Sequence, residues 1–244
     1  MRTQTKFSAK GAAGVMLDVR SGEVLALASL PDFDPNAPTN DPEQNRFNQV
    51  TKGIYELGSV FKTFTVAMAL DSGLVSIGDG FDASRPLRIA SHTINDFHGK
   101  NRWLSVPEIF IYSSNIGTAK IAKAVGIERH KDFLRALGFY DRSPIELPEV
   151  GAPKVPDKWR EISAATISYG HGLAVSPLQL ASAAAAMVNG GRLVDATILK
   201  RDPAEVRPRQ VISPATSRQM RTLLRKVVTD GTGSKADAVG YRVG

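Results

Sequence analysis

The segment that begins at Ser59 constrains the fold of this chain more than any other. Apolar side chains occupy most positions from Val60 to Leu70, and Gly73 follows them, a pattern that predicts a largely buried helix ended by a glycine. Ser59 and Lys62 stand three residues apart in its first turn. This spacing puts both side chains on one face with their Cβ atoms about 5–6 Å apart, so the lysine tip can reach the serine hydroxyl.

This serine–lysine pair can act as nucleophile and base. A neutral amine on Lys62 can accept the Ser59 proton, provided that burial and neighbours lower the lysine pKa. Gly58 lets the main chain approach a substrate closely, and the Ser59 N–H, which has no intrahelical acceptor, is a candidate oxyanion donor. The alternative is a helix-capping serine beside a solvated lysine, because about one Ser-x-x-Lys is expected by chance in such a chain.

A second polar motif lies in the run from Tyr112 to Gly117, which contains Ser-x-Asn. Ser113 can relay a proton to a leaving amine, while the amide of Asn115 can bind a peptide backbone or hold Lys62. The alternative is a polar turn that opens the next helix.

Serine enzymes that use Ser-x-x-Lys and Ser-x-Asn to transfer an acyl group also carry a third motif, Lys-Thr-Gly. This third motif is absent from the sequence. The most similar run is Asp230–Lys235, in which the lysine lies on the wrong side of Thr-Gly. We expect this run to form a turn after a helix and assign it no catalytic role.

The rest of the chain predicts strands first and helices afterwards. Residues 14–20 and 23–29 have the length and punctuation of two hairpin strands, and residues 30–50 read as a surface loop. Further helices are predicted from Ser105, over 117–125 and 128–137, from Ser176-Pro177 to Asn189, and from Ser213-Pro214 to about Val228. Tyr241-Arg-Val is strand-like. We therefore expect one α/β domain over residues 1–244, with a helical lobe inserted after the first hairpin.

Composition excludes several classes of protein. With 244 residues, 42% of them hydrophobic, the chain is globular rather than disordered. The net charge of +7 comes from mostly scattered basic residues, which favours a solvated surface over nucleic-acid binding. Four histidines without paired-ligand spacing, together with the lack of cysteine, predict no metal site and no thiol chemistry. The sequence has neither a signal peptide nor an apolar run long enough to span a membrane.

Longer segments surround these motifs in a fixed order and resemble the transpeptidase domain of class B penicillin-binding proteins. They are Ala13–Ser29, Arg46–Ser59, Tyr169–Ala181 and Asn189–Gly191. Two more, Asp96–Glu108 and Ser113–Lys120, are most similar to the division-specific branch, which crosslinks septal peptidoglycan.

The resemblance implies a fold like that of penicillin-binding proteins and serine β-lactamases, with an antiparallel sheet, flanking helices and the inserted helical lobe. It implies that Ser59 attacks the carbonyl of a D-Ala-D-Ala stem peptide with Lys62 as base, and that an amine of a second stem peptide then takes the acyl group. β-Lactam antibiotics would acylate the same serine, and Asn115 would bind the stem peptide. No cofactor is implied.

Three residues near these motifs are less constrained. Tyr169 and His171 lie in a loop that borders the cleft in relatives, so they can touch substrate; equally, Tyr169 can be a core residue and His171 part of a turn. Leu57 stands where many relatives carry proline before Gly-Ser, and we expect this departure to have a small effect.

The resemblance also implies features outside these residues. In relatives, a sequence like Gly240–Gly244 leads directly into Lys-Thr-Gly, so we expect the domain to be truncated and its fold incomplete at the C-terminus. A membrane helix before the domain, a periplasmic location at the inner membrane, and a lipid-linked glycan polymerase and other division proteins as partners are implied likewise. Two alternatives stay open: a penicillin-binding fragment or scaffold with impaired catalysis, and a β-lactamase or D,D-carboxypeptidase.

Overall fold

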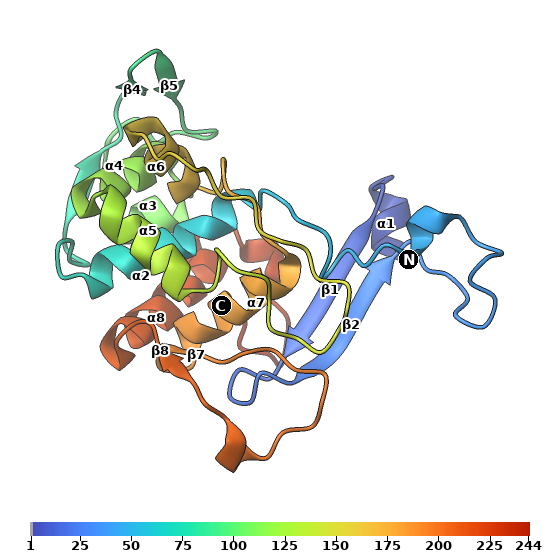
Figure 1. The fold of residues 1–244 in the computed structure, drawn as a ribbon. Coiled ribbons are helices and arrows are strands. Elements are labelled where there is room, and N and C mark those ends of the chain that lie inside the picture. The colour runs from blue at the N-terminus through green and yellow to red at the C-terminus, as the bar shows by residue number, and fades with distance from the viewer. Residues whose placement is uncertain (1) are drawn as a thin grey trace.

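The computed structural model describes residues 2–244 and opens with a short helix and a β-hairpin (Figure 1). Helix α1 (Arg2–Lys6) precedes strands β1 (Ala12–Leu17) and β2 (Val24–Leu30), which pair antiparallel. The predicted hairpin is therefore confirmed.

A helical lobe follows the hairpin and lies on the opposite side of the molecule in Figure 1. Its helical elements are η2 (Gly58–Phe61), α2 (Lys62–Asp71), α3 (Val106–Ile111), α4 (Asn115–Val125), α5 (Ile127–Ala136) and α6 (Glu161–Ser168). Two small antiparallel strand pairs belong to the same lobe: β3 (Gly80–Asp82) with β6 (Trp103–Ser105), and β4 (Leu87–Ile89) with β5 (His92–Ile94). The lobe is thus inserted after the hairpin, as predicted.

The chain then returns through α7 (Pro177–Val188), which packs against β1 on one side and α8 (Pro214–Asp230) on another. The remaining elements are the strand pair β7 (Arg192–Leu193) and β8 (Arg209–Gln210) and the short 3-10 turns η1 (Glu43–Arg46), η3 (Pro203–Glu205) and η4 (Ser234–Ala236). Along residues 2–244, no helix combines the length and apolar character needed to cross a membrane.

Helix α2 lies at the centre of the larger hydrophobic core, with buried residues at most of its positions. Phe61 stacks on Phe139 with ring centroids 5.2 Å apart, and Phe64 meets both rings edge-on at 5.4 and 5.1 Å. Burying each such ring contributes about 1.5–3 kcal/mol, so this cluster ties the start of α2 to the loop after α5. The predicted buried helix is confirmed, although a 3-10 turn carries Ser59 and the α-helix begins at Lys62.

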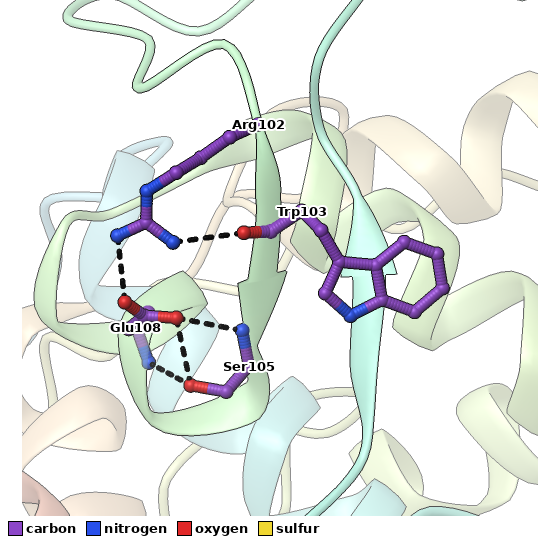
Figure 2. A network of polar contacts seen from close by, with 4 residues as sticks. All are labelled: Arg102, Trp103, Ser105 and Glu108. Atoms are coloured by element: carbon purple, nitrogen blue, oxygen red, sulfur yellow. Dashed lines mark hydrogen bonds and ion pairs between the residues drawn. The ribbon is translucent and has the colours of Figure 1, made fainter.

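Side-chain caps determine where the predicted helices at Ser105, Ser176 and Ser213 begin. Figure 2 shows the first of them, in which the Glu108 carboxylate accepts hydrogen bonds from the Ser105 N–H at 2.9 Å and from the Arg102 guanidinium at 2.7 Å. Arg102 and, after it, the Ser105 N–H lower the pKa of Glu108 to about 2. The cap keeps its charge at neutral pH and joins β6 to α3.

One predicted element is wrong. Residues 241–243, expected as a strand, are irregular. The Val243 carbonyl accepts a hydrogen bond from the Arg225 guanidinium at 2.7 Å instead of from a neighbouring strand. Strand-like composition forms a strand only where a second strand supplies the ladder, and no such strand lies beside these residues in the described chain.

The buried histidine of α5 gives a test of this packing. His130 is 1% exposed, contacts the Trp159 ring edge-on at 5.3 Å, and burial lowers its pKa from 6.5 to about 4. As the pH falls, His130 binds a proton in the unfolded chain before it does so in the folded one. The contribution of the neutral ring to the unfolding free energy is therefore complete above pH 6.5 and is lost as the pH falls toward 4, by roughly 3 kcal/mol in total.

We therefore expect His130→Phe to lose less unfolding free energy than the wild type between about pH 7.5 and about pH 5, as measured by urea denaturation. The matched control is His92→Phe at an exposed position, which should follow the wild type. Equal pH dependence of His130→Phe and wild type would contradict the neutral buried state of His130.

Candidate active site

Ser59 and Lys62 meet at the start of α2. The Lys62 side chain is buried, at 1% exposure, while Ser59 in the preceding 3-10 turn is exposed. The Lys62 amine lies 3.0 Å from the Ser59 hydroxyl and 2.7 Å from the hydroxyl of Ser113, and it also donates to the Ser113 carbonyl at 2.6 Å. The structure thus brings both sequence motifs together on one amine.

Burial changes the acid–base properties of this amine. Removal from water disfavours the ammonium form and lowers the pKa of Lys62 to about 8, while the negative charge of Asp96 works in the opposite direction. A lysine with this pKa is partly neutral near physiological pH. Its free amine can therefore accept a proton from a hydroxyl within hydrogen-bond distance.

Ser113 occupies a strained turn between α3 and α4. Its backbone has φ of +59°, in the left-handed region that side chains other than glycine rarely adopt, which costs roughly 1–2 kcal/mol. This conformation directs both its hydroxyl and its carbonyl at Lys62. The next residue, Ser114, caps α4 by accepting from the N–H of Gly117 at 2.9 Å. The run is therefore both a helix-opening turn and a partner of the lysine.

Asn115 lies at the first position of α4 and does not hold Lys62. Its side-chain nitrogen donates to the main-chain carbonyl of Asn95 at 3.0 Å. Among the described residues, no group donates to its side-chain oxygen. A bond from this amide to a peptide backbone stays a prediction.

The loop after α6 docks on the turn that carries Ser59. The Gly58 N–H donates to the carbonyl of Gly170 at 3.2 Å, and the Thr65 hydroxyl donates to the carbonyl of Ser168 at 2.8 Å. Gly170 has φ of +89°, and a Cβ atom there would overlap the Gly58 carbonyl. Two main chains thus approach each other closely beside the serine, which only glycine permits.

The side chains of this loop divide between core and surface. Tyr169 is 9% exposed and belongs to the hydrophobic core, while His171 is exposed. His171 Nδ1 lies 3.3 Å from the carboxylate of Glu56, which also accepts from the N–H of Gly172 at 2.9 Å. The Gly172 N–H and, more weakly, His171 lower the pKa of Glu56. Tyr169 therefore packs in the core, while His171 presents its ring at the surface.

Sequence reasoning missed Glu56, Asp96 and Gly170. All three lie in segments that carry the family resemblance, but each bonds to residues far away in the chain, and no local spacing marks such contacts. The Ser59 N–H has no intrahelical acceptor, as predicted, because Ser59 is the second residue of a 3-10 turn. In residues 2–244, no three His, Cys, Asp or Glu side chains gather as a metal site would need.

Comparison with known proteins identifies the family. A sequence profile described as "Penicillin binding protein transpeptidase domain" matches residues 12–244. The chain belongs to this family. The resemblance predicted from the motifs is confirmed.

Relatives agree with this assignment. The chain is 41% identical over 244 residues to the probable peptidoglycan D,D-transpeptidase FtsI of Caulobacter vibrioides, covering 98% of this chain and 41% of that protein. It is 35% identical to the probable peptidoglycan D,D-transpeptidase PenA of Neisseria meningitidis, covering 97% and 41%. The chain therefore spans about two fifths of the length of these curated relatives.

Solved structures of the family share the fold. The transpeptidase domain of Burkholderia pseudomallei penicillin-binding protein 3 superposes with a TM-score of 0.88 at 34% identity, covering 99% of this chain and 70% of that one. A peptidoglycan glycosyltransferase from Burkholderia ambifaria gives 0.89 at 34% identity, covering 99% and 73%. The predicted α/β fold of penicillin-binding proteins is confirmed.

Gly170 and Gly172, in the loop after α6, allow the effect of backbone strain to be measured apart from the effect of a close contact. Both Gly170 and Gly172 have φ of +89°, but a Cβ on Gly172 would find its nearest neighbour at an ordinary 3.5 Å. We expect Gly172→Ala to lower the unfolding free energy by about 1–2 kcal/mol through strain alone. Gly170→Ala should lower it by a further 1–3 kcal/mol, roughly, because the Gly58 carbonyl must move. Equal losses in urea denaturation would show that the two main chains are not tightly docked.

Proposed function

We propose that this chain is the catalytic domain of a peptidoglycan D,D-transpeptidase that works through an acyl-enzyme on Ser59. The observation that carries the proposal is the position of the Lys62 amine, 3.0 Å from the Ser59 hydroxyl and 2.7 Å from that of Ser113. The names of the relatives as peptidoglycan D,D-transpeptidases support the same reaction.

In the first half of the reaction, neutral Lys62 accepts the Ser59 proton while the hydroxyl oxygen attacks the carbonyl of the terminal D-Ala-D-Ala bond. The Ser59 N–H stabilises the negative charge that develops on the carbonyl oxygen. The proton passes through Ser113 to the leaving nitrogen, the C–N bond breaks, and D-Ala departs. The stem peptide is then bound to Ser59 as an ester.

In the second half, the amine of a neighbouring stem peptide attacks this ester. The attacking nitrogen loses a proton to Lys62, the new amide bond forms as the ester C–O bond to Ser59 breaks, and Lys62 returns the proton to the Ser59 oxygen. We assign Asn115, through its side-chain amide, to the donor peptide. Gly58, Tyr169 and His171 are assigned to the border of the binding site, since the loop that carries the last two docks on the Gly58 turn.

β-Lactams would acylate Ser59 by the same first step and remain bound as an ester. We propose that the substrate is peptidoglycan at the division septum, on the strength of the segments that resemble the division-specific branch and of the FtsI relative. A periplasmic domain tethered to the inner membrane, with a lipid-linked glycan polymerase as partner, is the setting that this assignment implies.

Labelling with a fluorescent penicillin tests the nucleophile. We expect the intact natural protein to be labelled and Ser59→Ala to lose the label. Ser234→Ala, an exposed serine in the run Asp230–Lys235, is the control and should label fully. Labelling of Ser59→Ala would refute the assignment, and rapid turnover of a chromogenic cephalosporin would identify a β-lactamase instead.

The base gives a second prediction. Because only the neutral amine accepts a proton, the acylation rate should rise with pH and level off above the Lys62 pKa of about 8. Lys62→Arg keeps a positive charge that does not titrate in this range, so it should be roughly 10²–10⁴-fold slower and lose this pH dependence. Stopped-flow acylation across pH measures both. A wild-type rate that does not change through pH 8 would exclude Lys62 as the base.

A further inference from the structure

Three consecutive residues at the start of α4 donate hydrogen bonds to the segment just after β5. The Ser114 hydroxyl donates to one oxygen of the Asp96 carboxylate at 2.7 Å, and the Ile116 N–H donates to the other at 2.9 Å. Between them, the Asn115 amide donates to the Asn95 carbonyl at 3.0 Å. Asp96 and its neighbour thus clamp the residues that directly follow Ser113.

Asn95 and Asp96 hold the residues next to Ser113, whose backbone is strained. Ser113 has no hydrogen bond to Asp96, and its φ of +59° must be maintained by the surrounding chain. On one side, its N–H donates to the Phe110 carbonyl of α3 at 3.2 Å. On the other side, Asp96 holds Ser114 and Ile116. A carboxylate that accepts from a helix N-terminus is favourably placed with respect to the helix dipole.

The segment that contains Asp96 is also held at its other end, Arg102. The segment that begins with Asp96 runs to Arg102, whose guanidinium bonds to Glu108 at 2.7 Å in the capping network of α3 (Figure 2). One segment therefore grips both helices that flank Ser113, α4 through Asp96 and α3 through Arg102.

We propose that Asp96 is a positioning residue for acylation: its carboxylate holds the turn at Ser113 so that both oxygens of Ser113 bond to the Lys62 amine. This inference rests on the proposed function of Ser59 and Lys62.

Asp96 also acts on Lys62 through its charge. Burial lowers the pKa of the Lys62 amine, and in the described chain the negative charge of Asp96 is the influence that raises it. Ser59 and Ser113, which contact this amine, are uncharged, and Glu56 and His171 pair with each other. Loss of the Asp96 charge should therefore lower the Lys62 pKa further, whereas a simple structural role would leave it unchanged.

The chain offers a matched control at the other end of α2. Asp71 also accepts hydrogen bonds from a hydroxyl, that of Thr216 at 2.8 Å, and from a main-chain N–H, that of Ser213 at 2.7 Å. These donors likewise lie at the start of a helix, α8. Asp71 is nine residues after Lys62, about 13 Å along the helix axis, so its charge and bonds are remote from the site.

The test compares Asp96→Asn, Asp96→Glu and Asp71→Asn in the intact natural protein. Acylation by a fluorescent penicillin is followed across pH, and the protonation of Lys62 is followed independently by NMR of its side chain. For Asp96→Asn we expect the maximal rate to fall roughly 10- to 100-fold and the pH midpoint of both measurements to move to lower pH. Asp96→Glu keeps the charge, so its rate should fall while its midpoint stays close to that of the wild type. Asp71→Asn should change neither.

The outcomes separate this inference from the proposed function. An unchanged rate and midpoint in Asp96→Asn would overturn the inference, and so would a lower rate with no movement of the Lys62 titration. If Asp96→Asn does not fold, a full wild-type rate in Asp96→Glu would overturn it. Labelling that persists in Ser59→Ala would refute the function instead, and the NMR titration of Lys62 would still measure the effect of Asp96.

Discussion

The site depends on one buried lysine. Lys62 begins α2, the helix at the centre of the larger core, and the packing of Phe61 and Phe64 draws the start of that helix out of solvent. A buried ammonium is unfavourable unless it is bonded and balanced by charge. Here three hydrogen bonds to Ser59 and Ser113 and the nearby charge of Asp96 offset that cost incompletely, which leaves the lysine with a pKa of about 8.

The rest of the lobe supplies these partners from separate parts of the chain. The turn between α3 and α4 brings Ser113, the segment after β5 brings Asp96, and the loop after α6 docks on Gly58 next to Ser59. None of these segments is a neighbour of Lys62 in the chain. Their convergence follows from helix packing, in which α2 contacts α3, α4 and α6.

Three residues with positive φ lie where these segments meet. Gly58, Gly170 and Ser113 all have positive φ, and Ser113 does so with a side chain. The conformation of Ser113 persists only where the surrounding structure imposes it, whereas glycine adopts a positive φ readily. The bonds from α4 to Asp96 supply that constraint at Ser113, and the bond from Gly58 to Gly170 joins the loop after α6 to the turn that carries Ser59.

The sequence by itself determined the features that depend on short-range contacts. The caps at Ser105, Ser176 and Ser213 are bonds between a side chain and a main-chain N–H three residues away, and the pairing of Ser59 with Lys62 follows from helical spacing. Only the tertiary structure decided the contacts of Asp96 with Ile116 and of Glu56 with Gly172, which lie 20 and 116 residues apart. It also decided that residues 241–243 form no strand, because strand pairing, unlike a helix cap, needs a partner from elsewhere in the chain.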